Sequence, residues 1–369
     1  MPRFLHAALV MTAVLVASLG VVAPADTAAP SISVVDLDSG NPIEAASVRV
    51  VGAPAGGARI VALGQGAFNV DAPNGSLLAV DVSAPAYSSA TVALEVPSGG
   101  SETRVRLTHI GPMLARWMKA VNDDRAEAGA APLTLDESLI EAARAHASEM
   151  ARHGYMSHYD LQGLLPLDRC AQAGGLLCAE NLAWGQASAL EAEAAFMAER
   201  SSCARTCPPS AGHYLNLISD ADVIGLAVSQ GPLRRGDGVS PTRPFYDQEF
   251  ARRAGAVRAP DAPTRATVGS NVAVRFRLLD GHRAAFANWF HTTCPSAPLS
   301  LASLSENAPS EPNAGCSTTT PTQAGLRLSS DGRDPTLMTL RGTPTAPGIW
   351  YLGIADSTGF LAVSAVRVQ

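Results

Sequence analysis

Residues 31 to 108 alternate apolar and polar positions in short runs that Gly, Pro, Asn and Ser interrupt. A period of two places the apolar side chains of each run on one face of a β-strand. The runs with this period are 47–51, 67–71, 77–83 and 91–96. We therefore predict a small antiparallel β-sandwich over residues 30–109.

After this region the apolar residues recur at helical spacing. The pattern predicts helices over 113–128, 136–153 and 188–200, followed by a buried strand over 223–228. Thr134 with Glu137, and Ser188 with Glu191, are candidate capping boxes for the second and third helices. The mixture predicts an α+β unit over residues 112–232, and residues 230–263 are expected to be connection and loop.

Strand-like alternation returns near the end of the chain. The clearest runs are 266–278, 347–356 and 361–368, and the last two are expected to form a closing hairpin. We predict an immunoglobulin-like β-sandwich over residues 258–369. The expected architecture is thus multidomain, with a central α+β unit between two all-β sandwich domains.

The first 25 residues look like an export signal. A basic start at Met1–Arg3 precedes an uncharged, mostly apolar run from Ala7 to Val22, and Ala23–Ala25 fits a small-x-small cleavage site. The alternative is an uncleaved anchor, but the run is short for a spanning helix. We therefore expect a signal peptide over residues 1–25, no transmembrane segment after cleavage, and a secreted protein, extracellular or periplasmic.

The six cysteines agree with an oxidising compartment, where disulfides persist. Six cysteines allow fifteen pairings, so proximity is the only guide. Neighbouring positions suggest three bonds: Cys170–Cys178, Cys203–Cys207 and Cys294–Cys316.

Length and charge narrow the classes of function. At 369 residues the chain suggests two or three domains, and 47% hydrophobic with 16% charged residues suits folded modules. A net charge of −6 gives no electrostatic case for nucleic acid, because phosphate-binding surfaces need an excess of Lys and Arg.

Four short motifs of the central region hold residues that bind metals or polarise water. They are Tyr155-Met-Ser-His158, Ala179-Glu-Asn-Leu-Ala-Trp-Gly185, Phe196-Met-Ala-Glu199 and Gly212-His-Tyr214. Two imidazoles and two carboxylates, from His158, Glu180, Glu199 and His213, can bind a divalent cation or hold a water between them. Taken singly, each would be an ordinary surface or helical side chain.

The motifs, in this order, resemble those of the CAP superfamily, which comprises cysteine-rich secretory proteins, antigen 5 and pathogenesis-related proteins, with bacterial SCP-like extracellular relatives. Runs before them resemble that family's opening helices: Val121-Asn-Asp-Asp-Arg125, Gly129-Ala-Ala-Pro-Leu133, Leu135-Asp136, Leu139, Ala142-Ala143, Ala147 and Met150-Ala151. Upstream, Val35–Val48, Gly66–Val70 and Ser83–Tyr87 resemble carboxypeptidase regulatory-like domains.

The CAP resemblance implies an α-β-α sandwich with a shallow cleft. It implies His158 and His213 as ligands of zinc or another divalent cation, and Glu180 and Glu199 as their acidic partners. Three positions depart from the family pattern. Ala179 replaces a Gly, Phe196 replaces a Trp, and Ala211 replaces a Cys.

Three functions remain open at this stage. The first is an extracellular binding protein whose cleft holds a cation, a small ligand or a lipid. The second is a metal-assisted hydrolase, peptidase-like, in which Glu180 or Glu199 is the catalytic general base. The third is a structural or adhesive protein that contacts the cell envelope. The chain contains no His-Glu-x-x-His motif, which weighs against an established metalloprotease class.

Overall fold

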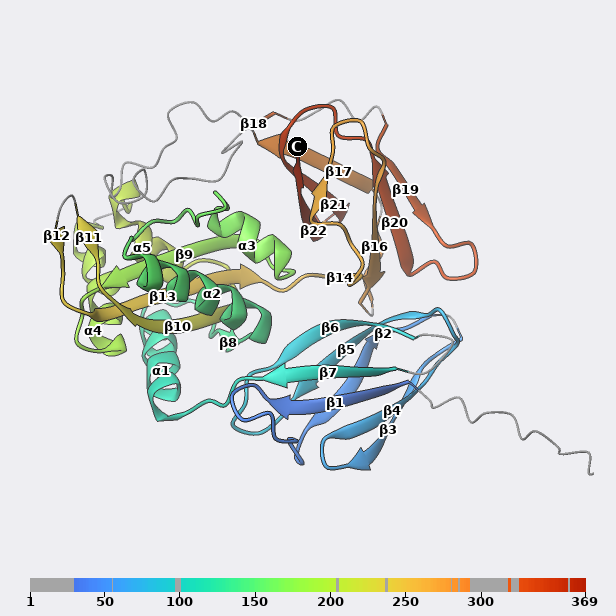
Figure 1. Cartoon of the computed structure of the whole chain (residues 1–369), viewed down its shortest axis with the longest axis horizontal. Helices are drawn as coiled ribbons and strands as arrows, with labels where there is room; N and C mark the ends of the chain where they lie inside the picture. Colours follow the sequence, from blue (N-terminus) through green and yellow to red (C-terminus); the bar gives the residue numbers. More distant parts are fainter. Residues whose placement is uncertain are drawn as a thin grey trace, which may run out of the picture.

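The computed structural model describes residues 30–54, 56–96, 101–203, 206–235, 238–279, 281–284, 286–292, 318–319, 325–357 and 359–369. The chain forms three regions, each with its own buried core, and Figure 1 displays them in blue, green to yellow, and orange to red. The expected signal peptide and the Cys294–Cys316 pair lie outside the described residues. Among the helices that are described, none has the length and apolar character needed to cross a membrane.

The first region consists of two sheets around one core. One sheet has the order β3 (Arg59–Gly64), β4 (Ala67–Asp71), β1 (Ser31–Asp36), β7 (Glu102–Leu107). The other has the order β2 (Ser47–Gly52), β5 (Leu77–Ser83), β6 (Ala90–Glu95). Val34 of the first sheet and Val80 of the second share the core, as the period of two predicts. All four predicted strands are confirmed.

The central region is a four-stranded sheet with helices on both faces. Its strands, in spatial order, are β8 (Thr134–Leu135), β10 (Val223–Gly231), β13 (Arg243–Arg252) and β9 (Leu176–Trp184). Its helices are α1 (Pro112–Glu127), α2 (Glu137–His153), α3 (Pro166–Gln172), α4 (Ala189–Ala198) and α5 (Gly212–Leu217). Short 3₁₀ turns cover Glu199–Ser202 and Pro209–Ala211, and a small hairpin joins β11 (Arg234–Arg235) to β12 (Gly238–Val239). The three predicted helices and the predicted strand are confirmed.

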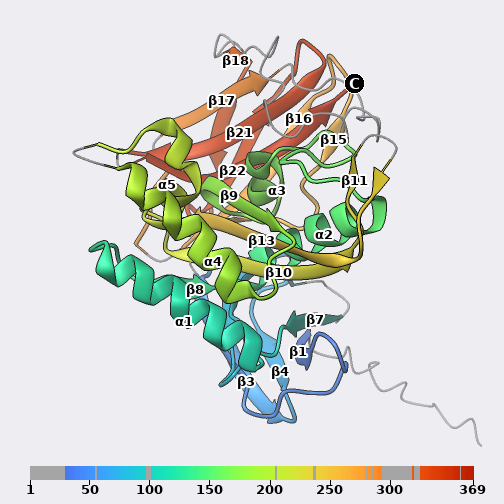
Figure 2. The same cartoon turned by 90° about the vertical axis from the view of Figure 1, so that its left-hand side faces the viewer.

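Alternate residues of β13 face different helices. Tyr246 and Phe250 share a core with Trp117 of α1 and Phe196 of α4. Phe245, on the opposite face, packs with Met150 of α2. Figure 2 views the molecule from the side of α1 and α4, with the sheet behind them. β9 is an edge strand of this sheet.

The expectation that residues 230–263 form connection and loop is wrong. β13 lies in this stretch, between β10 and β9, and is antiparallel to both. Asp247, Gln248 and Glu249 occupy its middle with no exposed surface. The sequence pattern did not predict this central strand, because a buried strand usually consists of a run of apolar residues and this one has three consecutive polar residues. This strand also lies beyond the expected domain limit at residue 232.

The ends of α2 differ from the predicted capping box. Asp136 is the N-cap, and its Oδ1 accepts hydrogen bonds from the backbone N–H groups of Ser138 at 3.0 Å and Leu139 at 3.3 Å. Glu137 instead reaches the first region, where it accepts hydrogen bonds from Thr108. Gly154 ends the helix with a φ of 74°, the left-handed conformation that glycine adopts most readily.

The third region again has two sheets. One has the order β14 (Ala256–Arg258), β16 (Val272–Leu278), β20 (Leu337–Gly342), β19 (Arg327–Ser330). The other has the order β15 (Arg265–Ala266), β22 (Gly359–Val368), β21 (Gly348–Asp356), β17 (Phe286–Thr292), β18 (Thr318–Thr319). The hairpin predicted from residues 347–368 is confirmed, since β21 and β22 pair antiparallel.

Two of the three expected disulfides are confirmed. Cys170 is bonded to Cys178, and Cys203 to Cys207. The first bond joins the end of α3 to β9. It therefore fixes α3 beside the strand that carries Glu180.

Candidate functional site

The structure brings the four predicted site residues to one pocket. His158, Glu180, Glu199 and His213 all line a cavity of about 540 Å³, together with Asn216. The pocket lies next to the edge strand β9, which carries Glu180.

The first pair is His158 and Glu180. His158 lies in the loop after α2, and its Nδ1 is 2.5 Å from Glu180 Oε2. The His158 side chain is 33% exposed, whereas that of Glu180 has no exposed surface. The strand thus supplies a rigid, buried acid, and the loop supplies a ring that reaches solvent.

The second pair, His213 and Glu199, repeats this arrangement. His213 Nδ1 is 2.6 Å from Glu199 Oε1. Glu199 Oε2 accepts hydrogen bonds from the backbone N–H groups of His213 at 2.9 Å and Tyr214 at 3.3 Å. Phe196 lies beside the His213 ring, with ring centres 5.0 Å apart. The aromatic residue that replaces Trp therefore keeps a packing contact with the imidazole.

In both pairs the carboxylate occupies Nδ1 of its imidazole. A carboxylate on one ring nitrogen fixes the orientation and tautomer of the imidazole, and raises its basicity as a ligand. The two glutamates therefore hold the two rings in place.

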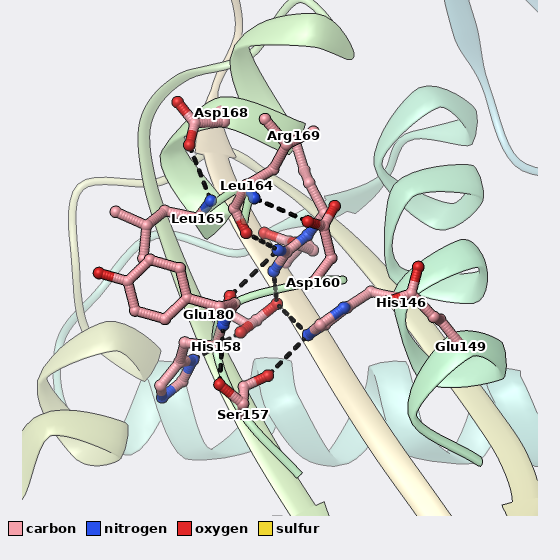
Figure 3. Close-up of polar contacts among 12 residues, drawn as sticks. His146, Glu149, Ser157, His158, Asp160, Leu164, Leu165, Asp168, Arg169 and Glu180 are labelled. Carbon is pink, nitrogen blue, oxygen red and sulfur yellow. Dashed lines mark hydrogen bonds and ion pairs between the residues drawn. The ribbon is translucent and has the colours of Figure 1, made fainter. Parts of the chain in front are cut away.

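Arg169 of α3 is a site residue that the sequence reasoning did not identify. Its Nη2 donates a hydrogen bond to Glu180 Oε1. Nη1 donates to the carbonyl oxygens of His158 at 3.1 Å and Leu164 at 2.9 Å. Figure 3 shows the guanidinium beside Glu180, with His158 and His146 around the same carboxylate. Arg169 thus fixes both the acid and the loop that carries its histidine.

The charge of Arg169 determines the ionisation of Glu180. Burial alone would raise the pKa of this carboxyl group, but Arg169 and the nearby histidines lower it to about 2. Glu180 is therefore ionised at neutral pH.

Further acids lie behind Glu180 on β13. Glu249 is directly opposite Glu180 in the register of the two strands, and its Oε1 accepts a hydrogen bond from Arg169 Nε at 3.3 Å. Asp247 lies two residues along the same face. Burial and the neighbouring carboxylates raise the pKa of both well above the usual values.

His146 of α2 also belongs to this group. Its side chain has no exposed surface. Its Nε2 is 2.9 Å from the Ser157 carbonyl oxygen and 3.8 Å from Glu180 Oε1. Burial, assisted by Arg169, lowers the pKa of His146 to about 3, so the ring is neutral. Donor atoms of His146, Glu180 and Asp247 lie within 4.8 Å of one another and could hold a metal ion.

Asn181 braces the turn at His213. Its Nδ2 donates hydrogen bonds to the His213 carbonyl oxygen at 3.1 Å and to Gln248 Oε1 at 3.0 Å. Asn216 Nδ2 donates to Asn181 Oδ1 at 2.9 Å and to the Glu180 carbonyl oxygen at 3.0 Å. These bonds tie α5, which carries His213, to the strand that carries Glu180.

Comparisons with known proteins agree with the motifs. Residues 118–239 match the family described as CAP, the cysteine-rich secretory protein family. The chain therefore carries a CAP domain. This domain is the central α+β region, which contains the paired histidines and glutamates. The resemblance of the first region to carboxypeptidase regulatory-like domains is not tested by this match and stays a prediction.

Among solved structures, an extracellular protein with an SCP domain from Bacillus anthracis str. Ames is similar, with 21% identity and a TM-score of 0.28. The match covers 38% of this chain and 40% of that chain, so this chain spans less than half of its length. The filamin domain of Lin-41 is similar with 11% identity and a TM-score of 0.20, over 31% of this chain and 93% of that one. No curated protein matches the sequence.

Proposed function

We propose that this chain is a secreted CAP-domain binding protein whose cleft holds a divalent cation through Nε2 of His158 and Nε2 of His213. One observation carries the proposal: both rings line the same pocket, and each is bound at Nδ1 by its own glutamate. Metal-binding histidines usually have such a carboxylate on the other ring nitrogen.

The donor set fits zinc or a similar cation, for which neutral imidazole is a good ligand. Two imidazoles are one fewer than the three protein ligands usual in catalytic zinc sites, so the cation would keep open positions. A cation bound there would polarise a water or a ligand oxygen. The protein's own part is to hold both rings in one orientation.

The burial of Glu180 argues against the hydrolase alternative in the form that uses this residue. A general base works best with a pKa near the operating pH and within reach of the proton it removes. Glu180 has no exposed surface, its pKa is about 2, and Arg169 and His158 already bind its oxygens. Glu199 is 25% exposed, and any hydrolytic role would fall to it.

The ligand we propose is a small molecule with polar and apolar parts. Leu165, Pro166 and Leu167 line the pocket together with the two His–Glu pairs. A lipid headgroup or a cell-envelope component would combine these two characters.

We further propose that the protein acts outside the cytoplasm. The disulfides Cys170–Cys178 and Cys203–Cys207 and the family of the central domain support this location. The two β-rich regions would then be sandwich modules, carboxypeptidase regulatory-like and immunoglobulin-like, that space the CAP domain or attach it to a surface.

Zinc titration of protein treated briefly with a mild chelator tests the cleft. We expect one rapidly exchanging zinc per chain in the wild type and none in His158→Ala or His213→Ala. Glu199→Gln keeps both ligands but removes the charge behind one of them, and should weaken zinc binding by about 10–100-fold.

His153→Ala is the matched control, because this histidine lies at the end of α2 and is not among the residues lining the cleft. Its zinc affinity should equal that of the wild type. Unchanged rapid binding in both His158→Ala and His213→Ala would refute the proposal.

A further inference from the structure

Asp247 has an unusual environment for a carboxyl group. It lies in the middle of β13 with no exposed surface, and neither of its oxygens has a hydrogen-bond partner among the described residues. Buried polar groups are nearly always hydrogen-bonded, and an orphaned one needs an explanation. The nearby donor atoms of His146 and Glu180 provide one.

We propose that His146, Glu180 and Asp247 form an internal site for a first-row divalent cation, separate from the cleft. One imidazole and two carboxylates are a mixed nitrogen and oxygen set, which suits zinc, manganese or iron rather than calcium or magnesium. The carbonyl oxygen of Ser157 supplies a fourth donor beside the imidazole.

The two distances from His146 to neighbouring donors are compatible with a common ion, and a donor oxygen of Asp247 lies within 4.8 Å of the donor atoms of His146 and Glu180. His146 Nε2 lies 2.9 Å from the Ser157 carbonyl oxygen and 3.8 Å from Glu180 Oε1. Bonds of about 2.1 Å place neighbouring ligands about 3.0–3.5 Å apart, depending on the geometry. Small shifts of side chains therefore suffice for coordination. The ring would bind through Nε2 and carry its proton on Nδ1.

The balance of charge supports the same site. Arg169 forms ion pairs with Glu180 and Glu249 and acts electrostatically on Asp247, and it is the one buried cation near these three acids within the described part of the chain. With every group ionised, three carboxylates and one guanidinium leave two negative charges in excess, and one divalent cation would neutralise them. Uncompensated buried charge is costly, so either a cation or protons must bind there.

Protonation alone explains the structure less well. A protonated Asp247 carries an O–H group, yet neither of its oxygens has a hydrogen-bond partner among the described residues. Glu249 is less isolated than Asp247, because one of its oxygens already accepts a hydrogen bond from Arg169. A cation would satisfy the oxygens of Asp247 that otherwise have no partner among the described residues.

The internal site shares Glu180 with the cleft but uses a different oxygen. Oε2 binds His158 at the cleft, whereas Oε1 faces Arg169 and His146. The side chains of His146 and Glu180 have no exposed surface, and Asp247 has none either. An ion there would exchange slowly, in contrast to one in the half-exposed cleft.

The test is the metal content of the full chain produced with zinc and then dialysed against a mild chelator. We expect one zinc per chain to remain in the wild type and to leave only on unfolding. Asp247→Asn, of nearly the same shape, should retain less than a tenth of it. His213→Ala should lose the rapidly exchanging cleft zinc and keep the slow one.

Glu193→Gln is the matched control, because Glu193 is a buried acid on the opposite face of the sheet, where it binds Gln248 and Trp117. This variant should retain one slow zinc. Slow zinc in Asp247→Asn at the wild-type level would overturn the internal site, and so would its complete loss in His213→Ala. A His213→Ala protein that loses the rapidly exchanging zinc and keeps the slow one would support two separate sites, because only the cleft would then depend on His213.

Crystals of the zinc-loaded wild type give an answer even if Asp247→Asn does not fold. An anomalous peak at the zinc edge between His146, Glu180 and Asp247 would support the site. Density without anomalous signal, as expected for a water, would overturn it.

Discussion

Glu193 of α4 is a buried acid with no ion-pair partner among the residues that the structure describes. Its Oε2 accepts hydrogen bonds from Gln248 Nε2 at 2.6 Å and from Trp117 Nε1 at 3.1 Å, while its Oε1 has no partner among the described residues. Burial raises the pKa of Glu193 to about 7. The pKa of Glu180 is lowered instead, although both glutamates are buried, because Arg169 lies beside Glu180.

This raised pKa predicts that stability depends on pH. Between the unfolded value of 4.5 and the folded value of about 7, the folded state holds an extra proton on Glu193, so stability falls as pH rises through this window. Glu193→Gln keeps a neutral side chain of the same shape. It should match the wild type at pH 4.5 and be more stable by about 3 kcal/mol at pH 8.

Urea unfolding of both proteins at the two pH values measures the difference. Glu191→Gln, an exposed position on the same helix, is the control and should follow the wild-type dependence. Parallel pH curves for the wild type and Glu193→Gln would contradict the prediction.

Individual site residues were predictable to different degrees. His158, Glu180, Glu199 and His213 could be identified because each sits in a short motif, and the motifs follow a known order. Arg169 could not, because it lies outside the four motifs and its carboxylate partners, Glu180 and Glu249, are 11 and 80 residues away in the sequence. A lone arginine on a short helix otherwise looks like a solvated surface residue.

The helix α2 and the strand β10 approach each other closely. A side chain at Gly225 of β10 would place its Cβ 2.2 Å from backbone carbon and oxygen atoms of Leu139 in α2. Backbone atoms cannot rotate away as side chains can. The absence of a side chain at this position therefore sets the distance between the helix and the sheet.

We predict that Gly225→Ala displaces α2 and lowers the free energy of unfolding by about 3 kcal/mol, at the upper end for overpacked sites. Gly332→Ala is the control, since a Cβ at Gly332 meets no atom within 4 Å, and its effect should stay within about 0.5 kcal/mol. Chemical denaturation measures both variants. If Gly225→Ala were as stable as Gly332→Ala, the prediction would be wrong, because α2 could then move away from the sheet without lowering the free energy of unfolding.

The elements themselves were predictable where one periodicity governs a segment. Leu114, Trp117 and Val121 of α1 recur at helical spacing and are all buried. β13 was missed because its two buried faces carry different chemistry. Asp247 and Glu249 face the group around Arg169, while Gln248 faces Glu193. Such a strand has no apolar stripe for a sequence pattern to reveal.

At the scale of the whole molecule, buried polar contacts join the three regions. Glu137 of α2 accepts a hydrogen bond from the Thr108 backbone N–H at 2.6 Å. Arg277 of the third region has no exposed surface and donates to the Leu77 carbonyl oxygen of the first at 2.5 Å. Composition and periodicity predicted three regions, but these contacts join residues 29 and 200 positions apart, which no local pattern reveals.

The contact between the central and third regions leads to a prediction about the cleft. The Tyr351 hydroxyl of β21 donates a hydrogen bond to Asp168 of α3, and both residues are buried. Asp168 precedes Arg169, which holds Glu180, and its other oxygen accepts from the Leu165 N–H at 2.7 Å. Tyr351→Phe should lower stability by about 1–3 kcal/mol, because it leaves a buried acceptor unsatisfied.

The same substitution should loosen α3 selectively, since Asp168 then keeps only its bond within that turn. Hydrogen exchange should become faster at α3 amides and stay unchanged in β5 and β6, which lie in the first region. Tyr246→Phe is the matched control: it removes a hydroxyl that donates to the Gln186 carbonyl oxygen within the central region. Equal protection of α3 in both variants would mean that the third region does not support the helix behind the cleft.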